Sequence, residues 1–317
     1  MELSEIRALI QPELEAVDAL IHQRASAQLE LVNSLTSHVA QAGGKRLRPT
    51  ILLLVAKAFN YVGNDHITLA AATELVHTAS LLHDDVVDES TMRRGIATAN
   101  QIWGNTASVL VGDFLYSRAG ELAIALENVA IIKAFASSTH LLTQGEIIQL
   151  MHRRNFNMTM QDYLDIITLK TGRLFELSSE LATLLASPNH IDAAKAYGLN
   201  LGIAFQMMDD ILDYQGDAQQ IGKNVGDDLR DGNLTLPLLY ILKNENQSHI
   251  EAVKQAVNSG ELEPLQQAII ESNSIKHTQE MALEYMQKSL DALNEFPQNT
   301  YTDALKAIAH FSIKRNH

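Results

Sequence analysis

The 317-residue sequence contains no cysteine. Disulfide bonds, thiol nucleophiles and thiolate metal sites are therefore excluded. Only 6 prolines and 16 glycines are present, and aromatic residues make up 5% of the chain. So few turn-forming residues indicate long regular elements, and the abundance of alanine and leucine is typical of helices packed on helices.

Basic residues are also scarce, because 24 lysines and arginines stand against 38 aspartates and glutamates, for a formal net charge of −14. An acidic surface of this kind repels nucleic acids and anionic lipids. We therefore expect no nucleic-acid partner. An anionic substrate would have to be bound by local groups of basic residues.

Long hydrophobic runs are missing as well. No apolar stretch approaches the roughly 18–20 residues that cross a bilayer, so we expect no stable membrane insertion. The N-terminal segment is acidic and amphipathic, and it lacks the basic and apolar regions of a signal peptide. The expectation is a soluble, cytoplasmic protein.

Hydrophobic residues recur with helical spacing along nearly the whole chain, and no convincing strand pattern alternates with it. An opening helical hairpin is expected between Leu3 and Ile21, broken near Pro12. Other predicted helices, several of them apolar on more than one face and therefore central, cover residues 50–59, 68–88, 106–127, 129–151, 161–186 and 191–215. Because no linker or low-complexity tract interrupts them, we expect one all-α domain, residues 1–317.

Two helices that otherwise look buried contain the same cluster of aspartates, in LLHDDVVDES (81–90) and QMMDDILDY (206–214). Asp84 and Asp88 are four residues apart and share a helix face, as do Asp209 and Asp213. Carboxylates crowded into an apolar wall repel one another and would protonate or distort the helix. A divalent cation removes this conflict.

Oxygen ligands without histidine or cysteine favour Mg²⁺, which usually completes its coordination with water and substrate phosphates. Two facing clusters therefore predict a diphosphate bound through shared Mg²⁺. The alternative is that each cluster is a solvated helix end. Its repetition after an apolar turn in both segments argues for the metal site.

Basic residues gather in two segments close to these clusters. GGKRLRPT (43–50) places Lys45, Arg46 and Arg48 in a loop that opens with two glycines, and Pro49 is expected to begin the next helix. Cations beside a helix N-terminus form an anion site. MRRG (92–95) adds Arg93 and Arg94 just beyond the first aspartate cluster.

Other polar residues interrupt apolar helices. Lys170 needs a counter-ion, either a phosphate or one of the aspartates, because a buried unpaired lysine is costly. His77 lies two helical turns before Asp84, on the same face, which favours a ligand role over a core role. Gln206 precedes Asp209, and Lys223 follows in QIGKNVGDD; taken singly, both are also compatible with ordinary surface residues.

In their order and spacing, these segments resemble trans-isoprenyl diphosphate synthases. The resemblance is carried by GGKRLRP, LLHDDVVDES with MRRG, KTG, FQMMDDILD and GKNVGDD. The longer strings HTASLLHDDVVDESTMRRGIATAN and ASVLVGDFLY are most similar to bacterial octaprenyl diphosphate synthases. The resemblance covers nearly the whole chain. It implies an isoprenoid-synthase fold, usually a homodimer, in which both aspartate clusters face a central apolar cavity.

The resemblance also implies roles for the matching residues. Mg²⁺ would be held on the allylic diphosphate by Asp84, Asp88, Asp209 and Asp213, the catalytic set that Lys170 completes. An allylic substrate such as farnesyl diphosphate would further contact Arg93, Lys170, Thr171, Gln206 and Lys223. The diphosphate of isopentenyl diphosphate would contact Gly44, Lys45, Arg48, His77 and Arg94.

The implied reaction is repeated addition of isopentenyl diphosphate to an ionised allylic diphosphate, giving the octaprenyl or nonaprenyl side chain of respiratory quinones such as ubiquinone. Ala79 and Ser80 are small and lie one turn before Asp84, where bulky residues would limit product length. Phe135 is a candidate for the floor of the product tunnel. DGNLTLP has Asn233 where many members of the family have lysine, which removes one possible phosphate contact.

The residues leave three alternative functions open. A class I terpene cyclase shares the ionisation chemistry but needs no second diphosphate site, which Lys45, Arg48 and Arg94 indicate. A regulatory subunit of a hetero-oligomeric prenyl synthase generally lacks one aspartate motif, whereas both are present here. A structural metal-binding bundle leaves the basic loops unexplained.

Overall fold

The computed structural model describes residues 1–25, 29–41, 43–215 and 226–314. Its longer helices are α2 (Gln11–Ala25), α3 (Glu30–Gln41), α4 (Leu47–Ala58), α5 (Asp65–Val87), α7 (Asn105–Ile124), α8 (Val129–His152), α10 (Arg173–Ala186), α11 (Ile191–Gln215), α15 (Gln247–Ser259), α16 (Glu263–Ser272), α17 (Ser274–Ala292) and α18 (Thr300–Ile313). Shorter elements are α1 (Leu3–Ala8), β1 (Met92–Arg93), β2 (Ile96–Ala97), α6 (Ala99–Trp103), α9 (Met160–Ile167), the π-helical turn η1 (Thr168–Gly172), the 3₁₀ turns η2 (Pro188–His190) and η3 (Leu293–Glu295), α13 (Asp227–Asp231) and α14 (Leu236–Asn244).

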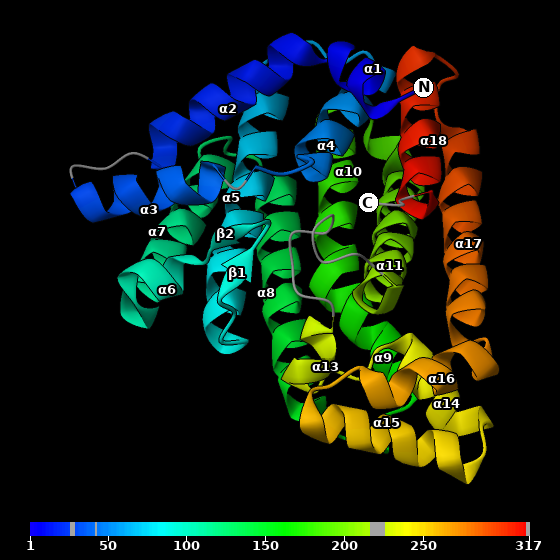
Figure 1. Cartoon of the computed structure of the whole chain (residues 1–317). Coiled ribbons are helices and arrows are strands. Elements are labelled where there is room, and N and C mark those ends of the chain that lie inside the picture. The colour runs from blue at the N-terminus through cyan, green and yellow to red at the C-terminus, as the bar shows by residue number, and fades with distance from the viewer. Residues whose placement is uncertain (26–28, 42, 216–225, 315–317) are drawn as a thin grey trace.

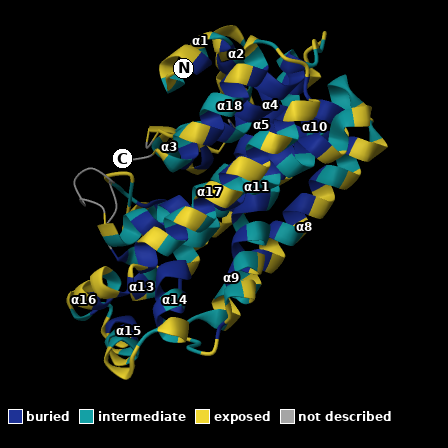
Figure 2. Cartoon of the chain, turned by 90° about the vertical axis from the view of Figure 1, so that its right-hand side faces the viewer, coloured by how far each residue is buried: buried dark blue, intermediate teal, exposed yellow. Residues whose placement is uncertain are grey.

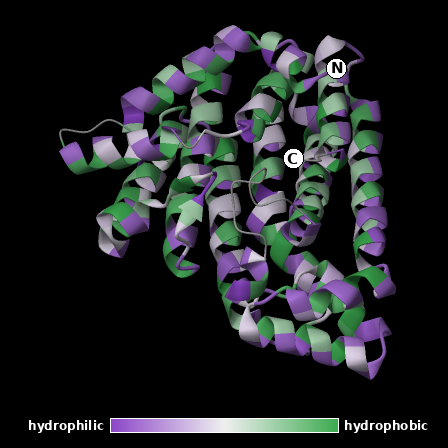
Figure 3. Ribbon diagram, in the orientation of Figure 1, coloured by the Kyte–Doolittle hydropathy of each residue, from purple (hydrophilic) through white to green (hydrophobic). Residues whose placement is uncertain are grey.

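The all-α prediction is confirmed across these residues. Figure 1 shows the long central helices α5, α8, α10 and α11 running alongside one another, while α2 and α3 cross one end of the bundle and α13–α16 gather at the other. Helix α11 packs against both α10 and α17, and α5 packs against α7. Peripheral helices such as α2 and α17 alternate hydrophilic and hydrophobic residues along their length (Figure 3).

Buried hydrophobic residues form two clusters, and helix α11 belongs to both. Leu201 and Ala204 pack into the first cluster, with helices α4, α5 and α10. Met207 and Ile211, one and two turns further on, pack into the second, with helices α9, α14 and α15. Figure 2 shows the buried residues on the inner sides of these helices. The second aspartate segment therefore lies where the two clusters meet.

Several boundaries differ from the sequence predictions. The break in the opening hairpin falls between Ala8 and Gln11, so Pro12 lies inside the first turn of α2. Helix α4 begins at Leu47 instead of Pro49. Proline is tolerated there because the first-turn N–H groups have no partner within the helix. Arg46, immediately before the helix, adopts a left-handed conformation with φ of 50°.

A small antiparallel hairpin, β1–β2, was not predicted. Met92 pairs with Ala97 and Arg93 with Ile96. The connecting Arg94 and Gly95 both have positive φ, at 51° and 80°. A two-residue turn with this geometry matches the twist of paired strands. The hairpin fixes the positions of Arg93 and Arg94.

The predicted helix 161–186 is also interrupted, by the π-helical turn η1. Neighbouring glycines make room for this wider turn. A Cβ on Gly145 of α8 would lie 2.8 Å from the Lys170 backbone nitrogen, and one on Gly202 would lie 2.8 Å from the Gly172 Cα. Turns of this kind often occur at functional sites. Here the turn contains Lys170 and Thr171.

Within the described ranges, we find no helix whose length and apolar character would let it cross a membrane.

The close packing of α10 on α11 generates a stability prediction. A Cβ on Gly198 would lie 2.4 Å from the Phe175 carbonyl oxygen and 2.7 Å from the Glu176 Cα, so helix backbones must separate to accept it. We expect Gly198→Ala to lower the free energy of unfolding by about 1–3 kcal/mol. Chemical denaturation measures this change.

Gly120→Ala is the matched control, because it adds the same methyl group to another helix where no atom lies within 4 Å. It should stabilise the protein by about 0.5–1 kcal/mol, as replacement of a helical glycine normally does. Equal effects of the two substitutions would contradict the packing argument.

Candidate active site

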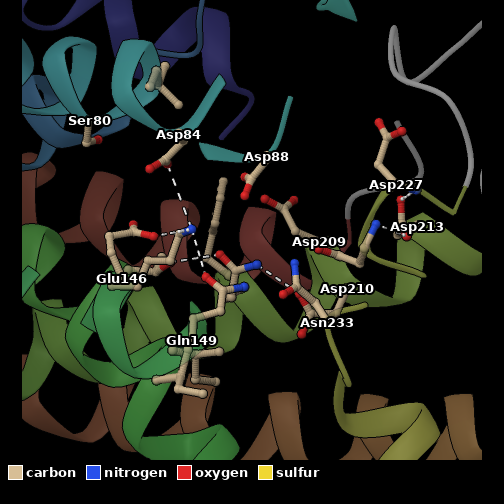
Figure 4. A pocket seen from close by; sticks show the side chains of 18 of the residues that line it. Ser80, Asp84, Asp88, Glu146, Gln149, Asp209, Asp210, Asp213, Asp227 and Asn233 are labelled. Carbon is tan, nitrogen blue, oxygen red and sulfur yellow. Dashed lines mark hydrogen bonds and ion pairs between the residues drawn. The ribbon is translucent and has the colours of Figure 1, made fainter. Parts of the chain in front are cut away.

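Both aspartate clusters line one cavity of about 650 Å³. Figure 4 shows Asp84 of α5 and Asp88, the residue that follows this helix, entering the cavity opposite Asp209 and Asp213 of α11. The predicted convergence of the two clusters is thus observed. The remaining wall comes mainly from the loop before α4 and the start of that helix, the β1–β2 hairpin, α8, α9, η1, α13 and residues 233–235.

Cations already neutralise the first cluster. The Lys170 ammonium lies 3.8 Å from Asp84 Oδ2, and the Arg153 guanidinium pairs with Asp88 Oδ1. Burial raises the pKa of Asp84; Lys170 opposes this rise and Asp88 adds to it. Asp85 points elsewhere and forms a buried ion pair with Arg93 Nε at 2.8 Å. Asp85 therefore anchors the β1–β2 hairpin, whereas Asp84 and Asp88 line the cavity.

The middle aspartate of the second cluster is likewise structural. Buried Asp210 accepts hydrogen bonds from the Tyr163 hydroxyl at 2.6 Å and from Gln206 Nε2 at 2.8 Å. Burial raises the pKa of Asp210 to about 8. The charge of Asp228 adds to this rise, and the two hydrogen bonds oppose it. Burial therefore disfavours the charged, metal-binding form of this carboxyl group.

Asp213 connects α11 to the next described element. Its carboxylate accepts hydrogen bonds from the backbone N–H groups of Asp227 and Asp228, each at 3.2 Å, at the start of α13. The charge of Asp209, one turn earlier, opposes the effect of burial on the pKa of Arg48.

Basic residues form a separate part of the same cavity wall, made by Lys45, Arg46, Arg48, Arg93, Arg94 and His77. Burial and the surrounding arginines lower the pKa of His77 well below its usual value, so the imidazole is neutral. Burial also lowers the pKa of Arg48 to about 10, although Glu74 and Asp209 oppose it. The Arg48 guanidinium stacks over Phe175, 4.7 Å from the ring centroid.

Two contacts set the shape of this basic wall. The Arg94 guanidinium donates to the Gly43 carbonyl, and a Cβ on Gly44 would lie 2.8 Å from Arg94 Nη1. Glycine at position 44 therefore lets Arg94 approach the loop. Arg46 also lines the cavity, where it forms ion pairs with Glu74 at 2.8 Å and Asp18 at 3.5 Å.

Lys170 has a partner that sequence reasoning missed. Its ammonium lies 2.7 Å from Glu146 Oε2 and donates to Gln149 Oε1 at 2.9 Å, so Asp84 is only its more distant counter-ion. Burial alone lowers the pKa of Lys170, but Asp84 and Glu146 outweigh it and raise that pKa. Burial raises the pKa of Glu146 to about 7 against the effect of Lys170.

Thr171 and Gln206 are brought together as well, with the Thr171 hydroxyl donating to Gln206 Oε1 at 2.8 Å.

Ser80 lines the cavity, whereas Ala79 and Phe135 lie in the hydrophobic core and are not among the lining residues. Lys223 lies outside the described residues. Asn233 is buried and lines the cavity, and its Oδ1 atom has no hydrogen-bond partner.

The donor set suits a hard divalent ion that shares its coordination with a ligand. Within the described residues, no three aspartate, glutamate or histidine side chains converge closely enough to hold a metal ion by themselves. Mg²⁺ typically uses one or two carboxylates together with waters and substrate phosphates. Paired carboxylates on two facing segments, with cations beside them, fit that pattern.

Comparisons with known proteins agree with this geometry. The family model for polyprenyl synthetase matches residues 29–271. Octaprenyl diphosphate synthase from Escherichia coli is 39% identical over 322 residues, covering 100% of both chains. All-trans-nonaprenyl-diphosphate synthase (geranyl-diphosphate specific) from Rhodobacter capsulatus is 39% identical and covers 98% of this chain and 97% of its own.

A solved structure is similar over the same extent. The polyprenyl synthase of Caulobacter crescentus, complexed with calcium and isoprenyl diphosphate, superposes with a TM-score of 0.95 at 37% identity. The match covers 100% of this chain and 98% of that one.

Proposed function

The chain belongs to the polyprenyl synthetase family, and on that premise we propose that it is a long-chain polyprenyl diphosphate synthase. It condenses isopentenyl diphosphate onto an allylic diphosphate such as farnesyl diphosphate, and its product is octaprenyl or nonaprenyl diphosphate. The observation that carries this proposal is one cavity lined by two aspartate clusters and a separate group of cations. Such a product would supply the side chain of respiratory quinones.

Each half of the cavity suits one of the two substrates. Asp84, Asp88, Asp209 and Asp213 would hold Mg²⁺, which when bound neutralises charge on the departing diphosphate. Lys170, Thr171, Gln206 and Arg93 would contact that allylic diphosphate, with Lys223 beyond the described residues. Gly44, Lys45, Arg48, His77 and Arg94 would bind isopentenyl diphosphate.

Ionisation of the allylic diphosphate in this cavity would depend on the stabilisation of negative charge and on the exclusion of water. Fixed cations next to the leaving diphosphate stabilise the ionised state without having to reorganise during the reaction. Apolar side chains in the lining, among them Leu81, Ile166 and Phe205, limit the access of water to the allylic cation. The neutral imidazole of His77 is available to donate a hydrogen bond to the diphosphate of the second substrate.

We also propose that residues 1–317 act as a single catalytic domain. Residues from both hydrophobic clusters line the cavity, Leu174 from the first and Met158 from the second. Helix α11, which contains Asp209 and Asp213, packs into both clusters.

Purified protein incubated with Mg²⁺, farnesyl diphosphate and labelled isopentenyl diphosphate should yield octaprenyl or nonaprenyl diphosphate, measured by sizing the products.

We expect Asp84→Ala and Asp209→Ala to fold normally but to lose roughly 10²–10³ in kcat, because each removes charge stabilisation at the leaving group. Asp192→Ala, at the exposed start of α11, is the control and should keep its activity. A fully active Asp84→Ala enzyme, or cyclised products formed without isopentenyl diphosphate, would refute the proposal.

Product length provides a second prediction. Ser80 lines the cavity one helical turn before Asp84, so Ser80→Phe should fill that space and shift the products to shorter chains. His83→Phe replaces an imidazole with a phenyl ring on the same helix, on a face directed at Val109, and should leave the product length unchanged. Phe135 lies in the hydrophobic core outside the residues that line the cavity, and we propose that it closes the product tunnel there, so Phe135→Ala should lengthen the product. Unchanged products from Ser80→Phe would contradict the role of this wall.

We further propose a homodimer, because neighbouring helices α7 and α8 expose large apolar side chains. Leu110 on α7 is 61% exposed, and Ile147 and Met151 on α8 are 53% and 75% exposed. Contiguous exposed apolar surface commonly marks an interface. Leu110→Glu should shift the sedimentation coefficient toward that of a monomer, whereas Val62→Glu, on a loop, should not. A monomeric unmodified protein would contradict the proposal.

A further inference from the structure

Tyr163, which lies outside the sequence motifs, begins a chain of hydrogen bonds that runs along the cavity wall. Its side chain is buried and lines the cavity from α9. The hydroxyl donates to Asp210 Oδ2 at 2.6 Å. Gln206 Nε2 donates to Asp210 Oδ1 at 2.8 Å, and the Thr171 hydroxyl donates to Gln206 Oε1, also at 2.8 Å. All of these residues line the cavity, so the chain joins α9, α11 and η1 at the site itself.

The chain fixes which end of the Gln206 amide faces which neighbour. An amide oxygen only accepts hydrogen bonds and an amide nitrogen only donates them, so Thr171 must donate and Asp210 Oδ1 must accept. The amide nitrogen carries two N–H groups, and one of them is used by Asp210. Because Asp210 is its one hydrogen-bond partner among the described residues, the other N–H of Gln206 remains for a ligand in the cavity.

Tyr163 connects this amide to the rigid core of the protein. Its ring packs in the second hydrophobic cluster, which also contains Met207 and Ile211 of α11. From that fixed position the hydroxyl holds Asp210 Oδ2, and the other carboxyl oxygen, Oδ1, is thereby turned to Gln206, one helical turn earlier on α11. A residue that directly contacts a ligand is held precisely when its own partners are fixed by packing and hydrogen bonds.

We propose that Tyr163 is a positioning residue for the allylic diphosphate, and that it acts through Asp210 and Gln206. This inference rests on the proposed function, under which Gln206 contacts that diphosphate. The chain sets the orientation of the amide before the ligand arrives, so little side-chain freedom is lost on binding. Asp210, the middle residue of the second aspartate cluster, then orients a ligand-binding amide and need not bind metal.

The test measures binding without turnover. The probe is farnesyl thiolodiphosphate, in which sulfur replaces the bridging oxygen, titrated calorimetrically at saturating Mg²⁺ into the full-length protein. We expect Tyr163→Phe to weaken binding by about fivefold to tenfold, because Gln206 loses its fixed orientation and with it part of one hydrogen bond to a charged group. The dissociation constant of isopentenyl diphosphate should change by less than about twofold, because the basic residues proposed to bind it share no partner with this chain.

Tyr197→Phe is the matched control for the loss of one buried hydroxyl group. Tyr197 is fully buried, and its hydroxyl donates to the Leu305 carbonyl of α18 at 3.0 Å, outside the cavity lining. Thermal unfolding records the loss of stability in both variants. Tyr197→Phe should bind the probe as tightly as unmodified protein does, whereas equal losses of affinity in the two variants would overturn the inference.

A double variant tests whether Tyr163 acts through Gln206. Gln206→Met removes the amide but keeps an unbranched side chain of similar length, and it should itself weaken binding of the probe. Adding Tyr163→Phe should then cause no further loss, because two residues that act through one contact are not additive. Unchanged or tighter binding by either single variant, or losses that multiply in the double variant, would overturn the inference.

Asp210→Leu interrupts the same chain at its middle and replaces Tyr163→Phe if that variant does not fold. It removes the acceptor of Gln206 and should weaken binding of the probe at least as much, so unchanged binding would also overturn the inference.

Unmodified protein distinguishes this inference from the function on which it rests. If it fails to bind the probe and fails to condense farnesyl diphosphate with isopentenyl diphosphate, both proposals fall. If it binds and condenses normally while Tyr163→Phe binds equally well, only the role of Tyr163 is refuted.

Discussion

Repulsion among carboxylates inside an apolar helical bundle is the constraint around which this protein is built. Asp84 and Asp88, at the end of α5, share a cavity with Asp209 and Asp213 on α11. Neutralising groups from other elements let these carboxylates coexist. Lys170 and Arg153 serve the first cluster, and backbone N–H groups of α13 serve Asp213. A metal ion and a diphosphate would arrive at a site already arranged for charge compensation.

The same constraint accounts for irregular features of the fold. The π-helical turn η1 interrupts a long helix at Lys170 and Thr171, and the glycines at positions 145 and 202 give it room. The β1–β2 hairpin, anchored by the Asp85–Arg93 ion pair, brings Arg93 and Arg94 to the cavity. Acidic and basic side chains therefore line the same cavity, and under the proposed function they would hold two diphosphates at once.

Much of this arrangement could be predicted from the sequence, because it depends on local spacing. Aspartates four residues apart must share a helix face, and helical periodicity identifies most of the long helices. The partners supplied by distant elements could not be predicted. Glu146 lies in a largely apolar stretch of α8, and nothing in its sequence neighbourhood marks it as the closest counter-ion of Lys170. Its spacing from Gln149, three residues further on, is the only local signal.

The separation of roles within each cluster also required the structure. Nothing in the spacing distinguishes Asp210, buried against Tyr163, from Asp209 beside it. The π-helical turn depends on close approach of α8 and α11 and leaves no periodic signature. Asn233 was noticed as a departure from the pattern of relatives, but its nearness to the end of α8 appears only in three dimensions.

Metal dependence of the two binding events tests the central claim most directly. Isopentenyl diphosphate and a non-ionising allylic diphosphate are each titrated into the protein, once with excess Mg²⁺ and once with EDTA. Two adjoining regions of opposite charge predict that isopentenyl diphosphate still binds its arginine-lined region in EDTA, whereas the allylic compound binds only with Mg²⁺. Equal dependence of both compounds on Mg²⁺, or equal independence from it, would contradict this division of the cavity.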